Sequence, residues 1–208
     1  DAIESMGLNH AVITVVNRDD LDDSGASHYR KCLEAVRDRT PEVTLELLCS
    51  DLAGDHDALA SLLDNLELEV FAHNVECVPR LDSIVRDARA SFDQSIGILK
   101  KAKELRPDIL TKSSIMVGLG ETDDEISHTL GLLRDANVDL VTIGQYLAPS
   151  ANHLKVDRFP EPSQYNDWSK EIEELGFLGW ACGPLVRSSY KAGELLSKAS
   201  ARLRTDKE

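Results

Sequence analysis

The 208-residue chain is poor in basic residues and has no long apolar run. It carries 23 lysine and arginine residues against 37 aspartate and glutamate residues, which gives a formal net charge of −14. Because phosphate backbones bind to basic faces, this balance argues against nucleic acid as a partner. No apolar run is long enough to cross a bilayer, and no targeting peptide stands at the start. We therefore expect neither a nucleic-acid-binding nor a membrane protein.

The four cysteines lack the spacing of a metal site. Cys32, Cys49, Cys77 and Cys182 are separated by 17, 28 and 105 residues. Metal-binding cysteines usually come in pairs two to four residues apart. We therefore expect free and mostly buried thiols, which is the common state of cysteine in a chain without a secretion signal.

Short, β-branched apolar runs alternate with longer amphipathic stretches. This alternation indicates βαβ units and a parallel sheet, and the unbroken apolarity of the runs indicates strands covered on both faces. Either an open doubly wound sheet or a complete or partial barrel fits the pattern. No Gly-x-Gly-x-x-Gly follows the first run, which disfavours a dinucleotide-binding fold. The expected strands are 10–16, 43–49, 68–73, 111–117 and 140–147, with an extended segment at 177–186, and the expected helices are 26–39, 55–65, 92–106, 123–136 and 164–175.

Polar residues gather just after the expected strands. In parallel α/β folds, ligands bind at the carboxyl ends of the strands. Taken singly, each polar group also fits a turn or a helix cap. Lys112 is harder to explain in this way, because a lysine inside a strand needs a partner for its ammonium group. Together the polar groups predict a ligand-binding mouth on one rim of the sheet; they are residues 17–20, 73–80, 112–122, 145–150 and 183–190.

Several of these segments resemble signatures of one enzyme family, the lipoyl synthases. Residues 71–81 (FAHNVECVPRL) are similar to the family's His-Asn-x-Glu-x-Val-Pro-Arg stretch. Residues 112–122 (KSSIMVGLGET), 140–150 (LVTIGQYLAPS) and 183–192 (GPLVRSSYKA) resemble three further signatures in the same order. In residues 15–20 (VVNRDD), Asn17 stands where the family has aspartate. The resemblance runs from about residue 1 to about residue 195.

The resemblance implies a fold, a reaction and cofactors. Lipoyl synthases belong to the radical S-adenosylmethionine enzymes, so the implied fold is a partial (β/α)6 barrel of the TIM type. Members insert two sulfur atoms, at C6 and C8, into an octanoyl chain held on a lysine of a lipoyl carrier protein. One [4Fe–4S] cluster cleaves S-adenosylmethionine, and a second, auxiliary cluster supplies sulfur. The implied partners are the glycine cleavage H protein, the E2 domains of 2-oxoacid dehydrogenases, and a reductant such as ferredoxin or flavodoxin.

The resemblance also implies roles for particular residues. Ser189 would be the serine ligand of the auxiliary cluster, with Arg187 beside it on the substrate side. Gln145 and Tyr146 are further candidates for contact with the substrate. The candidates for holding S-adenosylmethionine, on rim position and family pattern together, are Asn17, Arg18, Asn74, Glu76, Lys112 and Ser114.

The family's two cysteine triplets, Cys-x4-Cys-x5-Cys and Cys-x3-Cys-x2-Cys, are not among the 208 residues. The resemblance also implies a first barrel strand that this chain lacks, so we expect the chain by itself to bind neither cluster and to be inactive. The alternative is a non-catalytic module that binds a lipoyl carrier protein or S-adenosylmethionine. We expect a barrel domain at 1–195 and a fraying helical tail at 196–208. The acidity favours a bacterial cytoplasm, with the mitochondrial matrix as the other possibility.

Overall fold

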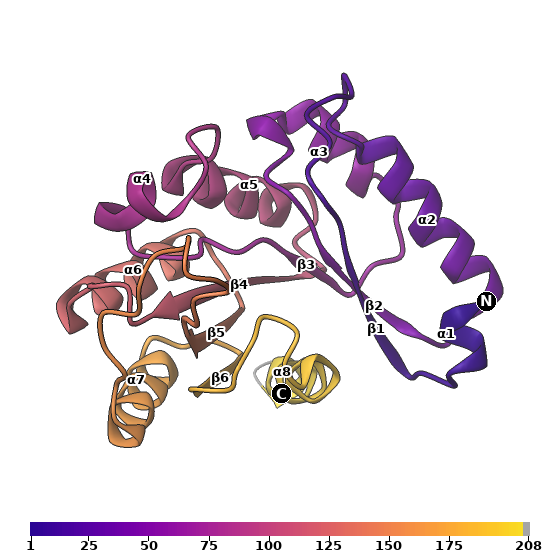
Figure 1. The fold of residues 1–208 in the computed structure, drawn as a ribbon. Helices are drawn as coiled ribbons and strands as arrows, with labels where there is room; N and C mark the ends of the chain where they lie inside the picture. The colour runs from indigo at the N-terminus through magenta and orange to yellow at the C-terminus, as the bar shows by residue number, and fades with distance from the viewer. Residues whose placement is uncertain (206–208) are drawn as a thin grey trace.

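Six parallel strands form one sheet in the order in which they occur in the chain, β1-β2-β3-β4-β5-β6. The computed structural model describes residues 1–205. Within them, β1 and β6 pair with one neighbour each, so the curved sheet stays open (Figure 1). The prediction of a partial α/β barrel is confirmed, and the open doubly wound alternative is not needed. The strands are β1 (His10–Thr14), β2 (Thr44–Leu48), β3 (Val70–Ala72), β4 (Leu110–Val117), β5 (Leu140–Gln145) and β6 (Gly179–Gly183).

A helix follows nearly every strand, as expected of βαβ units. Asp55 begins α3 by accepting hydrogen bonds from the backbone N–H groups of Asp57 and Ala58, at 2.9 and 3.0 Å. Thr122 and Glu125 form a reciprocal capping box at the start of α6. The helices are α1 (Ala2–Ser5), α2 (Ala26–Arg39), α3 (His56–Leu63), α4 (Asp82–Val85), α5 (Phe92–Leu105), α6 (Asp123–Asp135), α7 (Pro162–Glu174) and α8 (Ala192–Thr205), with short 3-10 turns η1 (Leu52–Gly54) and η2 (Pro79–Leu81).

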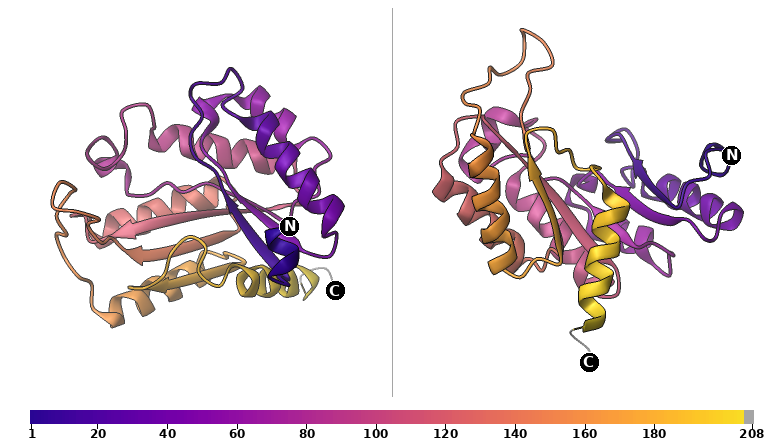
Figure 2. Two further views of the ribbon diagram at one scale, coloured as in Figure 1. Left: turned by 45° about the vertical axis from the view of Figure 1, so that its right-hand side comes forward. Right: turned by 90° about the horizontal axis from the view of Figure 1, so that it is seen from below.

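The two faces of the sheet are covered differently. Leu45, Phe71 and Ile143 belong to the main buried core, which the helices α2, α3, α5, α6 and α7 complete. The opposite face carries Val70, Leu110 and Leu140, and these pack with Ala199 of α8. Figure 2 shows α8 running along the sheet between the edges formed by β1 and β6. Helix α8 thereby covers the amino-terminal end of the inner face and leaves the carboxyl ends of the strands free.

Most strands are shorter than the apolar runs that predicted them. β1 ends at Thr14, and Val16, expected inside the strand, is 73% exposed. β6 ends at Gly183, where the chain turns away through residues 184–191. The apolar runs continue past the strands because their last residues leave the ladder to enter the rim loops. The expected domain boundary at residue 195 stays a prediction; α8 crosses it as one continuous helix, and residues 206–208 lie outside the described range.

Candidate functional site

A cavity of about 540 Å³ opens at the carboxyl ends of β1, β2 and β3. This volume lies within the range of small-molecule sites. Thr14 and Leu48, the last residues of their strands, line it together with Met116 of β4. The polar residues that line it are Asn17, Ser50, Asp51, His73, Asn74, Glu76, Arg86 and Asp87. The rim that the sequence predicted therefore contains a real cavity, on the half of the sheet nearest the N-terminus.

Glu76 is the most constrained residue of this cavity. Its φ is +67°, a left-handed value that is unusual for a residue with a side chain. Two backbone hydrogen bonds to β4 hold Glu76 in this conformation. Its N–H donates to the Ser114 carbonyl (3.2 Å), and its carbonyl accepts from the Met116 N–H (2.7 Å). Burial raises the pKa of the Glu76 carboxyl, although a hydrogen bond from Asn74 (3.3 Å) opposes the shift. Strain of this kind collects at binding sites.

His73 ties three elements together beneath the cavity. Its Nδ1 lies 2.9 Å from the Cys49 carbonyl, which can only accept, so Nδ1 carries the proton. Nε2 then accepts from the Ser95 hydroxyl of α5, at 2.8 Å. Burial lowers the pKa of His73, so the neutral tautomer is the resting form. The imidazole holds the ends of β2 and β3 against α5.

Two charged residues of the cavity wall have protein partners of their own. Asp51 accepts from the Gln94 side-chain amide, at 2.8 Å. Arg86 pairs with Asp82 at 3.4 Å. Asp51, Arg86 and Ser50 were not proposed from the sequence, whereas His73 belonged to the predicted rim (residues 73–80) without being a candidate for cofactor contact. Ser50 and Asp51 directly follow an expected strand and could have been found by the same rule, whereas Arg86 directly follows the unpredicted helix α4.

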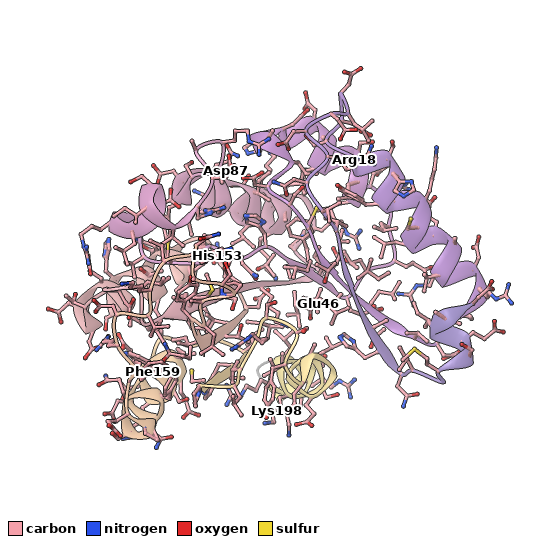
Figure 3. The ribbon with its side chains drawn as sticks, viewed as in Figure 1. Arg18, Glu46, Asp87, His153, Phe159 and Lys198 are labelled. Carbon is pink, nitrogen blue, oxygen red and sulfur yellow. The ribbon has the colours of Figure 1, made fainter. Side chains whose placement is uncertain are left out.

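Three of the six candidates for cofactor contact line the cavity: Asn17, Asn74 and Glu76. Arg18 lies outside it. Its guanidinium pairs with Asp20 at 2.7 Å, and its side chain borders a separate hollow beside His28 and Cys32. Figure 3 shows Arg18 and Asp87 on loops beyond the strands.

Lys112 and Ser114 do not line the cavity, because they lie deeper in the sheet. The Lys112 ammonium donates to both carboxylate oxygens of Glu46, at 2.8 and 3.0 Å, and both side chains are 1% exposed. Burial raises the pKa of Glu46, and Lys112 opposes that shift. The Ser114 hydroxyl accepts from Thr142, at 2.8 Å. The partner expected for a buried lysine is therefore a glutamate two strands away.

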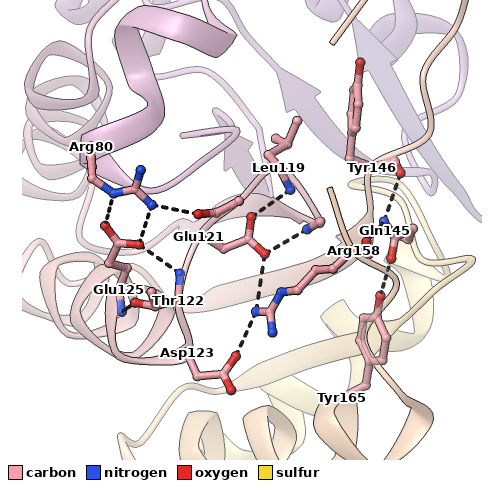
Figure 4. Close-up of polar contacts among 12 residues, drawn as sticks. Arg80, Leu119, Glu121, Thr122, Asp123, Glu125, Gln145, Tyr146, Arg158 and Tyr165 are labelled. Atoms are coloured by element: carbon pink, nitrogen blue, oxygen red, sulfur yellow. Dashed lines mark hydrogen bonds and ion pairs between the residues drawn. The ribbon is translucent and has the colours of Figure 1, made fainter. Parts of the chain in front are cut away.

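A second polar cluster, centred on Glu121, stands at the carboxyl ends of β4 and β5 (Figure 4). The buried Glu121 carboxylate accepts from the N–H groups of Gly118 and Leu119, both at 2.8 Å. It also pairs with Arg158, which bonds Asp123 at 2.8 Å. The N–H groups of Gly118 and Leu119 are thus already used by a carboxylate.

The side chains of Gln145 and Tyr146 form hydrogen bonds with the loop after β5. The Gln145 amide donates to the carbonyls of Tyr146 (3.0 Å) and Arg158 (3.1 Å), and its oxygen accepts from the Tyr165 hydroxyl. The Tyr146 hydroxyl donates to the Leu154 carbonyl, at 2.9 Å. Gln145 is 4% exposed. The contacts observed for both residues shape the loop on the expected substrate side.

The segment after β6 lies against Gly144 of β5. A Cβ at Gly144 would collide with the Val186 carbonyl oxygen and approach the Arg187 guanidinium. Arg187 donates to the carbonyls of Val186 (2.7 Å) and Pro184 (3.4 Å). Ser189 is exposed in the turn that leads into α8. Its carbonyl accepts from the Ala192 N–H, at 3.4 Å.

The cysteines of this chain do not fit an iron–sulfur cluster. Among residues 1–205, no group of three or more His, Cys, Asp or Glu side chains could hold a metal ion. Burial raises the pKa of Cys49 and Cys77 to about 12 and that of Cys182 to about 11. Cluster ligands are thiolates, so these neutral, separated thiols cannot serve. The expectation of free, mostly buried thiols agrees with this arrangement, in which only Cys32 is exposed.

The residues of the cavity, by contrast, fit S-adenosylmethionine. That molecule presents an amine, a carboxylate, a sulfonium and a ribose diol to its site. The carboxylates of Asp51 and Glu76 can face its positive and hydroxyl groups, and the amides of Asn17 and Asn74 can bind its carboxylate. The Glu76 carboxyl has one hydrogen bond from a side chain, that of Asn74, and so keeps acceptor capacity for a ligand.

A family model and several curated proteins match this chain. The family model described as "Radical SAM superfamily" matches residues 1–133. The chain is 50% identical over 205 residues to a mitochondrial lipoyl synthase of Schizosaccharomyces japonicus. It is 49% identical over 197 residues to a lipoyl synthase of Ectopseudomonas mendocina and 46% identical over 207 residues to the human mitochondrial lipoyl synthase. The matches cover 99%, 95% and 100% of this chain but 54%, 56% and 55% of those proteins, so the chain spans about half their length.

Two solved structures share the fold at low sequence identity. Methylornithine synthase superposes with a TM-score of 0.59 and 12% identity, over 81% of this chain and 49% of that one. Streptococcus suis SuiB, solved with S-adenosylmethionine bound, gives a TM-score of 0.53 and 8% identity, over 89% of this chain and 53% of that one. Within residues 1–205, no helix combines the length and apolarity needed to span a bilayer.

Proposed function

Because the chain belongs to the radical SAM superfamily and resembles lipoyl synthases along its whole length, we propose that it forms the barrel wall of a lipoyl synthase. The proposed reaction is the insertion of two sulfur atoms, at C6 and C8, into an octanoyl group bound to a carrier protein. The observation that carries the proposal is the cavity at the ends of β1–β3, where the strained Glu76 and its neighbour Asn74 meet Asn17.

In this proposal the cavity binds S-adenosylmethionine, whose cleavage supplies the radical that attacks the octanoyl chain. Glu76 and Asp51 bind the cationic and hydroxyl groups, and Asn17 and Asn74 bind the carboxylate. His73 acts as a positioning residue, because both of its ring nitrogens are already bonded within the protein and hold the ends of β2 and β3 against α5. Arg18, Lys112 and Ser114, which were expected to contact the cofactor, instead support the cavity wall from outside.

Ser189 remains the proposed oxygen ligand of an auxiliary cluster, and Arg187 its neighbour. The exposure of Ser189 supports this role, since a residue can bind a cluster held by another segment only if its side chain is accessible. The superfamily carries [4Fe–4S] clusters, for which residues 1–205 offer no set of thiolates. We therefore assign no step of the reaction to a cluster held by these residues.

The proposed partners follow from the proposed reaction. They are octanoylated lipoyl carrier proteins, namely the glycine cleavage H protein and the E2 domains of 2-oxoacid dehydrogenases, with ferredoxin or flavodoxin as reductant. The relatives include both bacterial and mitochondrial proteins. The net charge of −14 supports a bacterial cytoplasm as the proposed compartment, and a mitochondrial matrix is the alternative. A binding module without catalysis is the second candidate function, favoured by the absence of a cluster-binding group in residues 1–205.

A chimera tests the proposal. The N-terminal part of the Ectopseudomonas mendocina lipoyl synthase that lies outside the match is joined ahead of Asp1, and the product is supplied to a bacterium lacking its own lipoyl synthase. We expect growth without added lipoate. Ser189→Ala should abolish growth and sulfur insertion in vitro while cleavage of S-adenosylmethionine persists. Ser197→Ala, an exposed serine on α8, is the matched control and should behave as the parent.

The same chimera tests the cavity. Glu76→Gln should weaken S-adenosylmethionine binding about tenfold or more, since it removes a charged acceptor. Because burial raises the Glu76 pKa, the charged form destabilises the folded state. The glutamine variant should therefore melt at or above the parent temperature at pH 8, and the gain should vanish below the ordinary carboxyl pKa of 4.5. Unchanged binding of S-adenosylmethionine by a stable Glu76→Gln variant would remove the cavity from the mechanism.

A further inference from the structure

The large apolar side chains that reach solvent are concentrated on one rim. Eleven such side chains are exposed within the described residues, and all but Met6, Leu175 and Leu203 stand in segments that follow the carboxyl ends of strands. Five of these eight belong to the connections after β5 and β6. They are Leu147 (50% exposed), Leu154 (39%), Phe159 (69%), Leu185 (78%) and Tyr190 (41%). Exposed apolar groups that gather in one region of a surface mark interaction sites.

The two connections rest on the same end of β5, so they form one face. Residues 146–161 and 184–191 are together called the β5–β6 rim face below. Gly144 receives the Val186 carbonyl, and the adjacent Gln145 donates to the Arg158 carbonyl, at 3.1 Å. Figure 2 shows the connection after β5 projecting from the body of the molecule in both views.

Internal bonds hold the projecting connection in shape. The Asp157 N–H donates to the Gly118 carbonyl, at 2.8 Å, and Arg158 pairs with Glu121 and Asp123. The Tyr146 hydroxyl closes the connection on the Leu154 carbonyl. These bonds use backbone and charged groups, so the apolar side chains of the face are left for an outside partner.

The charge of the β5–β6 rim face is opposite to that of the rest of the chain. Its 24 residues include four basic residues and two acidic ones, whereas the whole chain has 23 basic and 37 acidic residues. Within the described part of the chain, neither Lys155 nor Arg187 makes an ion pair. An acidic chain that leaves unpaired cations among exposed apolar groups presents a local attraction for an acidic surface.

We infer that the β5–β6 rim face is the docking surface for the protein that presents the acyl chain, and that this partner meets it with an acidic patch. The inference rests on the proposed function. Leu154 and Leu185 contact the partner around the base of the acyl-lysine arm. Lys155 steers the approach, because long-range attraction between opposite charges raises the rate of encounter. The arm then passes over the rim toward the cavity at the ends of β1–β3.

The test measures the affinity of the 208-residue chain for a bacterial glycine cleavage H protein, octanoylated on its lysine and unmodified, by biolayer interferometry. Leu154→Ser combined with Leu185→Ser should weaken binding about tenfold or more, as removal of central apolar contacts does. Lys155→Glu should weaken it about threefold at low salt, with a smaller effect at high salt. The controls are Met6→Ser with Leu203→Ser, and Lys31→Glu on α2, which should bind as the parent does.

The outcomes separate this inference from the proposed function. If the parent chain binds the H protein and the rim variants bind it equally tightly, the docking face is overturned and the proposed substrate stays in place. If the parent chain binds neither form of the H protein, both the docking face and the proposed substrate are overturned. Concentration-dependent dimers of the parent that the rim variants lose would show instead that a second copy of this chain covers the face, and would also overturn it. Selective weakening by the rim variants supports the face.

Discussion

Single residues at the carboxyl rim owe their places to backbone constraints as much as to their side chains. Glu76 enters the cavity because its left-handed φ turns the chain off β3 while its N–H and carbonyl remain bonded to β4. Gly144 has the complementary role, since the absence of a Cβ lets the Val186 carbonyl lie directly on β5. Glu76 thereby lines the cavity, and Gly144 is the close-approach point for the segment that carries Ser189.

Gly144→Ala tests the second close-approach point. The added methyl group would overlap the Val186 carbonyl oxygen, so the connection after β6 must move. We expect a loss of about 1–3 kcal/mol in the free energy of unfolding, as for other overpacked sites, measured by urea denaturation. Gly131→Ala in α6 is the matched control. Its Cβ would meet no atom within 4 Å, and the change should stabilise the chain by about 0.5–1 kcal/mol. Equal stabilities of the two alanine variants would contradict the packing argument.

At the scale of elements, side-chain bonds join the connections to each other. Glu121 links the turn after β4 to the connection after β5, because its buried carboxylate holds two backbone N–H groups and Arg158 at once. Arg80 adds the connection after β3 by pairing with Glu125 and donating to the Gly120 carbonyl, at 2.7 Å (Figure 4). The rim is therefore a continuous polar network that spans three βα connections.

Glu121→Gln should loosen this network. An amide of the same size keeps one acceptor but turns a donor toward a backbone N–H, and it loses the ion pair with Arg158. We expect a loss of about 1–3 kcal/mol in stability, together with faster amide hydrogen exchange in residues 146–161. Asp124→Asn, at an exposed position in the first turn of α6, is the control and should leave that exchange unchanged. Slow exchange in 146–161 despite the Glu121 change would mean that the other bonds hold the connection by themselves.

At the scale of the whole molecule, the open sheet depends on how its inner face is filled. Its amino-terminal end is packed by α8, and its centre contains the ion pair between Glu46 of β2 and Lys112 of β4. This pair reaches across β3, so it joins two strands that are not neighbours in the sheet. Removing one member would leave the other charge buried without compensation.

A double-mutant cycle on this pair measures the coupling. Lys112→Met alone should cost about 3–5 kcal/mol in the free energy of unfolding, because Glu46 would be stranded in the interior. Adding Glu46→Leu should restore stability to within about 1 kcal/mol of the parent, since a well-packed apolar pair often replaces a buried ion pair without loss. Additive losses in the double variant, measured by chemical denaturation, would show that the two side chains act independently.

Local patterns in the sequence were enough to predict the parallel sheet, its six extended segments and most of its helices. Unbroken apolar runs can be buried on both faces only in such a sheet, and helix boundaries such as Asp55 and Thr40 are set by neighbours in the chain. The rule that ligands bind at the carboxyl ends of strands also predicted a polar rim, and three of its six candidates for cofactor contact, Asn17, Asn74 and Glu76, line one cavity. The tertiary structure decided the rest. It placed Lys112 below the cavity, because depth in the sheet depends on the register of β4 against β3. It brought in Arg86 from the end of the unpredicted helix α4, and it placed the connections after β5 and β6 against Gly144 and Gln145. Such contacts join residues far apart in the chain, and no local pattern encodes them.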